Sequence, residues 1–131
     1  MEVTMGAGEL PPGLRGLRLR VIVDDYEGHP PVPPGTVVNA IEDPGHPEFL
    51  VIELDAPIDV ERPSGPGSVA IRHLAVSPIG WDWEVLIRPP ARFTPLFVQV
   101  WHVFDPRLAT SKKWTPEQLR FVSRGRVTRV R

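Results

Sequence analysis

The chain has 131 residues, a formal net charge of −1 and 41% hydrophobic residues, which is enough apolar surface for one small domain with a packed core. It contains no cysteine, which excludes disulfides, thiolate metal sites and cysteine nucleophiles. Seventeen prolines and eleven glycines favour many short elements joined by turns. The first residues, MEVTMGAGELPPG, lack the features of a signal peptide, and no apolar run approaches the ~20 residues of a spanning helix. We therefore expect a soluble, cytoplasmic protein that does not enter a membrane.

The charged residues are unevenly distributed along the chain. Residues 1–104 carry seven basic and fourteen acidic side chains, whereas residues 105–131 carry eight basic and two acidic ones. A basic C-terminal region of this kind can fold back on the acidic part of the chain or bind a polyanion. The predicted organisation is a flexible lead-in over 1–13, a β-barrel domain over 14–104, and a basic extension over 105–131 that packs on the barrel.

Alternation of apolar and polar residues predicts strands along most of the chain. In LRGLRLRVIVDD, apolar side chains occupy every second position from Leu17 to Val23, which is typical of a half-buried strand. The turn DPGHP separates two further alternating segments, which predicts an antiparallel hairpin. The strands expected after the first cover residues 36–42, 49–55, 68–76, 81–87 and 96–104.

A proline-dense stretch, HPPVPPG, ends the acidic first loop, which covers residues 25–35. Its P-x-x-P spacing is also found in polyproline ligands. Because the stretch lies between two alternating strands, we interpret it as a loop scaffold whose prolines reduce the entropy of the unfolded chain. Residues 56–67 are predicted to form a second irregular segment.

The sequence TPEQLRFV contains the best helix start. Thr115 can act as an N-cap, Pro116 suits the first helical position, and Glu117 would lie at the positive end of the helix dipole. Gly125 offers a stop, and the final RGRVTRVR fits either a last short strand or a frayed tail. Five or six short strands with Pro/Gly turns predict an all-β barrel or sandwich, most simply a meander.

Residues 16–80 resemble a small SH3-like β-barrel. The resemblance rests on a first strand GLRLRVIVDD, a loop EGHPPVPPG, a hairpin GTVVNAIEDPGHPEFLVIELD and a final strand VAIRHLAV. This order is similar to the small barrels found in photosystem I and in the β-subunit of nitrile hydratase, and implies a module that serves as a docking element. The aromatic cluster of peptide-binding SH3 domains is missing, since Tyr26 is the only tyrosine. The predicted fold class is all-β: an SH3-like barrel with added C-terminal strands and one short helix.

The aromatic second half of the chain provides candidate contact residues. In LFVQVWHVF, both strand faces are apolar, so residues 105–131 or another chain must cover one of them. The leading hypothesis is a non-enzymatic interaction or accessory module that docks on a protein partner, or on a second copy of itself, through this strand and the acidic loop. The candidate contact residues are Phe97, Trp101, Tyr26 and Trp83.

Nucleic-acid binding is the first alternative. Basic and aromatic residues are interleaved in the C-terminal region, where they could contact phosphates and stack on bases. The overall pI of about 6.4 is low for a nucleic-acid-binding protein. The candidate residues are Lys112, Lys113, Trp114, Arg120, Arg124, Arg126 and Arg129.

A small enzyme or enzyme subunit is the second alternative. Three carboxylates and an imidazole within six residues could bind a divalent cation or form an acid/base pair: Asp24, Asp25, Glu27 and His29. Their spacing matches no calcium loop, and the four histidines of the chain do not have the spacing of a zinc site. No nucleophile or nucleotide-binding motif is found. The sequence therefore indicates neither a catalytic residue nor a cofactor.

Overall fold

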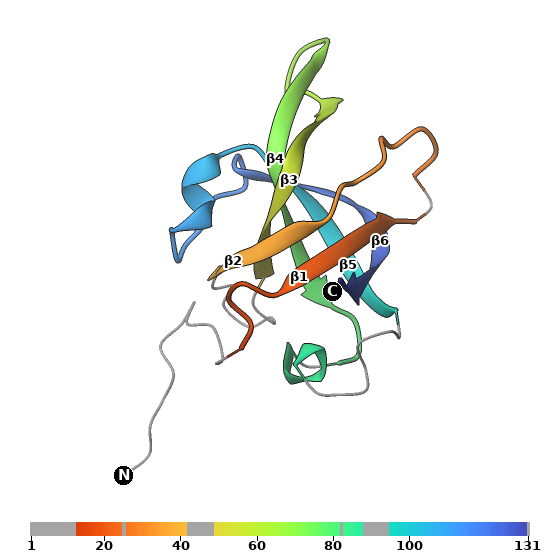
Figure 1. Ribbon diagram of the computed structural model, residues 1–131. Coiled ribbons are helices and arrows are strands. Elements are labelled where there is room, and N and C mark those ends of the chain that lie inside the picture. Colours follow the sequence, from red (N-terminus) through yellow and green to blue (C-terminus); the bar gives the residue numbers. More distant parts are fainter. Residues whose placement is uncertain (1–12, 25, 42–48, 82, 88–94, 131) are drawn as a thin grey trace.

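The strands of the protein close into an antiparallel barrel (Figure 1). The structure, a computed structural model, describes residues 13–24, 26–41, 49–81, 83–87 and 95–130. The strands are β1 (Arg18–Val23), β2 (Gly35–Ile41), β3 (Phe49–Glu61), β4 (Ser68–Pro78), β5 (Leu96–Val103) and β6 (Leu119–Arg129). Each strand pairs with the next along the chain, and β6 returns to pair with β1. The predicted all-β fold is confirmed, and its topology is a meander.

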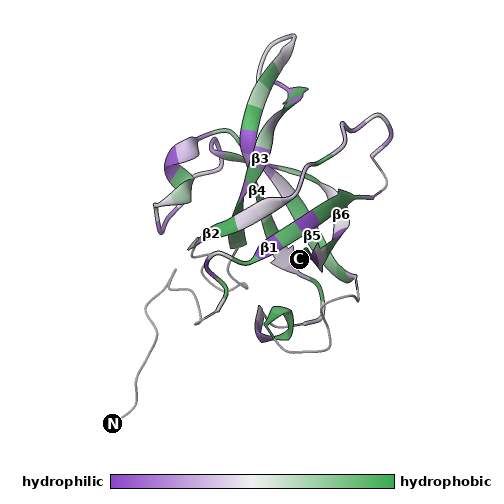
Figure 2. Cartoon of the chain, viewed as in Figure 1, coloured by the Kyte–Doolittle hydropathy of each residue, from purple (hydrophilic) through white to green (hydrophobic). Residues whose placement is uncertain are grey.

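The inward-facing residues of the six strands fill the barrel. The buried set includes Leu19, Val21, Val37, Leu50, Ile52, Leu54, Leu74, Val76, Val98, Val100 and Val127. Figure 2 shows apolar residues along all of the barrel strands. In β1 the alternation has the predicted parity, because Leu19 and Val21 are buried while Arg20 is exposed. Burial of one side chain in two is what imposes the period of two on these sequences.

The segment WDWEVLI does not form the predicted strand. Residues Trp83–Leu86 form a 3₁₀ helix, η1, while Asp82 lies outside the described residues. Side chains three positions apart share a side in such a helix, so Trp83 and Leu86 both reach the barrel core. The indole of Trp81 packs edge-on against Trp83, with ring centroids 5.2 Å apart. The apolar alternation of this segment therefore reflects packing at the end of the barrel.

The predicted helix over TPEQLRFV is also wrong. Thr115 and Gln118 close a single turn, in which Gln118 N donates to Thr115 O at 3.0 Å. From Leu119 the chain is strand β6, because it finds hydrogen-bonding partners on both sides, β5 and β1. The barrel therefore extends to Arg129, and only residues 105–118 of the predicted extension pack on it as a separate cover.

β3 is longer than predicted, and residues 56–61 are not irregular. After a register shift between Glu53 and Ile58, the β3–β4 ladder continues to the pair Glu61↔Ser68. Ile58 and Val60 are buried while Asp59 is exposed, so this part of the chain also alternates. The two strand ends project from the barrel as a hairpin arm (Figure 1).

A second, smaller core lies on the outer surface of the barrel. The 3₁₀ helix η3 (Pro106–Ala109) covers this second core. The buried residues of the second core are Ile41, Phe49, Val51, Ala75, Val103, Leu108 and Leu119. Asp105 caps η3, and hydrogen bonds from Arg107 and Gln118 hold the pKa of this carboxyl well below its usual range. Residues 105–118 thus cover the outward side of β5 at its Trp101–Val103 end within the same chain.

Replacing Asn39 by alanine should detach this cover. The buried Asn39 amide donates to Leu108 O at 2.9 Å and to Ser111 O at 2.5 Å, and the variant leaves both carbonyls without that donor. We expect the free energy of unfolding to fall by about 2 kcal/mol in urea denaturation. The exposed Gln99→Ala variant is the control, and equal stability of the two variants would contradict the anchoring role.

Candidate interaction surface

Phe97 is the most exposed of the large apolar side chains that the structure describes. Its exposed fraction is 59%, although it lies in a regular strand. The Phe97 carbonyl accepts hydrogen bonds from Ile79 N at 3.1 Å and from Trp81 Nε1 at 2.6 Å. The backbone is therefore fixed while the ring projects into water.

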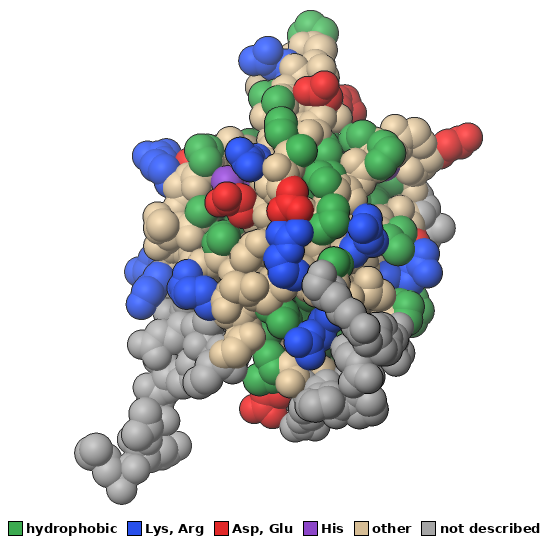
Figure 3. All heavy atoms as spheres, in the orientation of Figure 1, with side chains coloured by type: hydrophobic (Ala, Val, Ile, Leu, Met, Phe, Trp, Pro, Cys, Tyr) green, Lys and Arg blue, Asp and Glu red, His purple; other side chains and the backbone are tan. Residues whose placement is uncertain are grey.

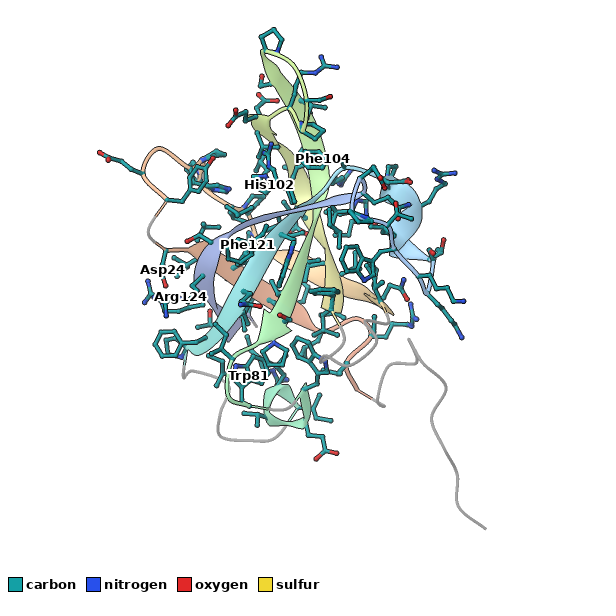
Figure 4. All side chains as sticks on the ribbon, turned by 180° about the vertical axis from the view of Figure 1, so that it is seen from behind. Asp24, Trp81, His102, Phe104, Phe121 and Arg124 are labelled. Carbon is teal, nitrogen blue, oxygen red and sulfur yellow. The ribbon has the colours of Figure 1, made fainter. Side chains whose placement is uncertain are left out.

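A hollow of about 320 Å³ lies beside this ring. It is lined by Asp24, Ile79, Phe97 and Arg124, which come from four different parts of the chain. Asp24 follows the end of β1 and lies next to Arg124 in the middle of β6, where Asp24 N donates to Arg124 O at 2.9 Å (Figure 4). We call the outward-facing surface formed by Ile22, Asp24, Ile79, Phe97, Arg124 and Arg126 the Phe97 face.

Two arginines give the Phe97 face its charge. Arg126 stands opposite both Ile22 and Phe97 in the strand register. Its guanidinium binds the Asp24 carboxylate, with Nη2 to Oδ1 at 3.0 Å. Arg124 is exposed and has no ion pair among the described residues. The face therefore combines a fixed ion pair, an exposed aromatic ring and the guanidinium of Arg124, which has no ion pair with any residue that the structure describes.

Trp101 lies in the second core and not on the Phe97 face. Its ring packs between Phe49 and Phe121, at centroid distances of 4.6 Å and 5.4 Å. Phe121 is 51% exposed and extends the apolar surface along β6. Sequence reasoning does not count Phe121 among the protein-contact residues, because it places this residue in a helix, although FVSRGRV also has strand character.

The other two predicted contact residues lie elsewhere. Tyr26 is exposed on the first loop, edge-on to His29 at 5.2 Å. Trp83 is half-buried in η1. Of the four candidates, the structure brings only Phe97 to the exposed face described above.

The predicted nucleic-acid residues do not gather on one surface. Lys112 and Lys113 are exposed after η3, and Trp114 packs on Phe49. Arg120 donates to the carbonyls of Glu61 and Arg62 in the arm. Arg124 and Arg126 lie on the Phe97 face, and Arg129 pairs with Leu19 at the end of β6. Figure 3 shows basic side chains scattered among acidic and apolar ones on the side that it presents.

The described residues do not support the divalent-cation site considered for the acidic first loop. Asp24 is bound by Arg126, Glu27 is exposed, and His29 contacts His102. Asp25 lies outside the described residues. Within the part of the chain that the structure describes, no three His, Asp or Glu side chains are close enough together to hold a metal ion.

A hydrogen-bonded chain of side chains links the first loop to the barrel. His29 Nδ1 lies 2.8 Å from Pro30 O, so this nitrogen carries the proton and Nε2 accepts. His102 Nε2 donates to that acceptor at 3.0 Å, and His102 Nδ1 then faces Arg120 Nη2 at 3.4 Å. His102 and Phe104 lie toward the end of the barrel opposite Trp81 (Figure 4). No motif could reveal this chain, because its members are 73 and 18 residues apart.

The fold and the Phe97 face together define a six-stranded antiparallel barrel with an exposed aromatic and arginine surface. No family model, curated protein or solved structure matches the chain. The similarity to SH3-like barrels therefore stays a prediction. None of the helices in the described ranges has the length and apolar character needed to cross a membrane.

Proposed function

We propose that the protein is a non-enzymatic interaction module that docks on another protein, or on a second copy of itself, through the Phe97 face. The observation that supports this proposal is the 59% exposure of Phe97 beside Ile79 and a hollow of about 320 Å³. Aromatic residues and arginine are enriched in the centres of protein interfaces, where an anchor ring fills a pocket.

The rigidity of the face also supports docking. Two hydrogen bonds fix the backbone at Phe97, and Asp24 fixes the guanidinium of Arg126. A partner would therefore immobilise few additional groups on binding, which lowers the entropic cost of association. Phe121 and Ile22, both exposed, extend the contact area along β6 and β1.

The Phe97→Ser variant should lose partner binding while keeping its fold. Truncation of a central aromatic anchor costs about 2 kcal/mol or more, so we expect affinity to fall by at least about thirtyfold. Solution mass first decides whether the partner is a second copy, and quantitative pull-down then compares the variants.

Asp59→Ser is the matched control, because Asp59 is an exposed strand residue of the hairpin arm and lies outside the Phe97 face. It should bind like the unaltered protein. A strictly monomeric protein with no recoverable partner, or equal binding by both variants, would contradict the proposal.

Nucleic-acid binding is the second candidate function, and one observation favours it. Arg124 and Arg126 flank an exposed ring that could stack on a base. If this function is correct, the affinity of the protein for single-stranded RNA should fall steeply as the salt concentration rises. The absence of RNA binding at low salt would contradict this function.

A further inference from the structure

β1 has one edge that is largely unpaired. Its ladder with β6 runs over all residues from Leu19 to Val23. Its ladder with β2 contains only the pairs Arg18↔Thr36 and Leu19↔Gly35. Beyond them, the loop that joins β1 to β2 arches away from the barrel (Figure 1). The seam between β1 and β2 is therefore open over the second half of β1.

The hydrogen-bond register identifies the backbone groups at this edge. Asp24 N donates to Arg124 O, and Val130 N donates to Arg18 O, both at 2.9 Å. Bonded pairs alternate along an antiparallel ladder, so the even-numbered residues of β1 bond to β6. The N–H and C=O groups of Val21 and Val23 consequently point toward the loop.

These groups lack partners within the described residues. Val21 is 2% exposed, and the hollow between β1 and the loop, which Val21 lines, gives access to these groups. A buried peptide group without a hydrogen bond is costly, and most such groups in proteins have a partner. The edge at Val21 therefore requires a ligand or ordered water.

The prolines of the loop explain why β2 does not supply that partner. Continuing the β1–β2 register would place Pro33 opposite Val21 and Pro31 opposite Val23. Both positions belong to the bonded class, and proline has no N–H to donate. The sequence HPPVPPG thus removes the donor of one of the two hydrogen bonds at each of these positions, where the proline carbonyl can only accept.

The space beside the open edge can hold a ligand. A hollow of about 300 Å³ lies between Val21 and Val23 on one side and Tyr26, Pro31 and Val32 on the other. This is the liquid volume of about ten water molecules. Arg20 and Ile22 also line it. The Arg20 side chain is exposed and has no ion pair among the described residues.

We propose that this edge binds an extended peptide segment of a partner protein, which adds a short strand to β1. The segment exchanges backbone hydrogen bonds with Val21 and Val23. It carries an acidic residue opposite Arg20 and an apolar residue opposite Ile22, at the closely spaced non-bonded pairs. This site goes beyond the proposed docking function and does not depend on the Phe97 face.

The test is amide hydrogen exchange of the ¹⁵N-labelled full chain, with and without a capped peptide Thr-Thr-Val-Thr-Glu-Thr as the probe, in which glutamate and valine are two positions apart like Arg20 and Ile22. The amides of Val21 and Val23 should gain at least about tenfold protection, while Ile22, which bonds to β6, should not change. The same peptide with N-methylated backbone amides removes the donors and should bind about tenfold more weakly.

Two protein variants make the test specific. Arg20→Glu should reverse the preference between this peptide and one with lysine in place of glutamate, because Arg20 is exposed and outside the core. Phe97→Ser should keep the added protection, so failure of the Phe97 docking face is distinguishable from failure of this site. No gain in protection at millimolar peptide, which means that water alone fills the hollow, or its loss in Phe97→Ser, would overturn the proposal.

Discussion

Replacing Gly125 by alanine should lower the free energy of unfolding by about 3 kcal/mol. A Cβ at this position would lie 2.3 Å from the Ile22 carbonyl oxygen and 3.0 Å from Val100 Cγ2. The oxygen belongs to the backbone of β1, which is held in the ladder with β6. It cannot rotate away as a side chain could, so the added methyl group forces the two strands apart at the seam that closes the barrel.

Urea denaturation followed by tryptophan fluorescence measures this loss. Thr128→Ala is the control on the same strand, and it should change stability by less than about 1 kcal/mol, since only strand propensity is affected. If Gly125→Ala is as stable as Thr128→Ala, the close approach of β1 to β6 at Gly125 does not constrain the barrel.

Acidification from about pH 7.5 to about pH 5 should cost about 2 kcal/mol of stability through His102 alone. Burial is the main cause that lowers the pKa of His102 to about 3 from the usual 6.5, and the nearby His29 and Arg120 lower it further. Between these two pKa values the unfolded chain binds a proton that the folded chain does not. Stability is therefore fully present above about pH 6.5 and falls progressively toward about pH 3.

The hydrogen-bonded chain gives this pH dependence a structural cause. His102 donates to His29 through one ring nitrogen and faces the Arg120 guanidinium with the other. If His102 Nδ1 gains a proton, its N–H faces the N–H groups of Arg120, and two buried donors then repel each other.

Comparison with His102→Gln isolates the contribution of this residue. The unaltered protein should lose about 2 kcal/mol more than the variant between the two pH values in urea denaturation. A titration of His102 by NMR should show no protonation above about pH 4. Parallel stability profiles for the two proteins would contradict the assignment.

The sequence predicts the strands well where burial acts on local residues. Leu19, Val21 and Ile52 face the barrel interior, and each lies in an alternating segment. Where the deciding partner is distant, local signals fail. Thr115 and Pro116 favour a helix, yet the ladder of β6 with β1, about 100 residues earlier, extends the chain from Leu119. η1 differs from its predicted strand because an apolar alternation also suits a short segment packed against the end of a barrel.

In the candidate site, too, the sequence indicates residues with local signals and misses those whose partners are distant. The doubly apolar β5 identifies Phe97, and residues 105–118 cover only the Trp101–Val103 end of the outward side of that strand. The Asp24–Arg126 ion pair joins residues 102 positions apart, so no spacing rule could reveal it. The open edge at Val21 is equally hidden, because HPPVPPG by itself indicates only the conformation of its own loop. Its effect on β1 depends on the register between the two strands.

The pairing of β1 has a consequence for the order in which the barrel is completed during translation. β1 has two registered pairs with β2, which the ribosome makes next, and five with β6, which it makes much later. Until the residues up to Arg129 have been added, β1 in the nascent chain lacks its main partner and presents hydrogen-bonding groups on both edges. Such edges can pair with other chains, so the protein is most vulnerable to misassembly just before translation reaches β6. Of the barrel strands, β1 is synthesised first and is the last to gain its main partner strand.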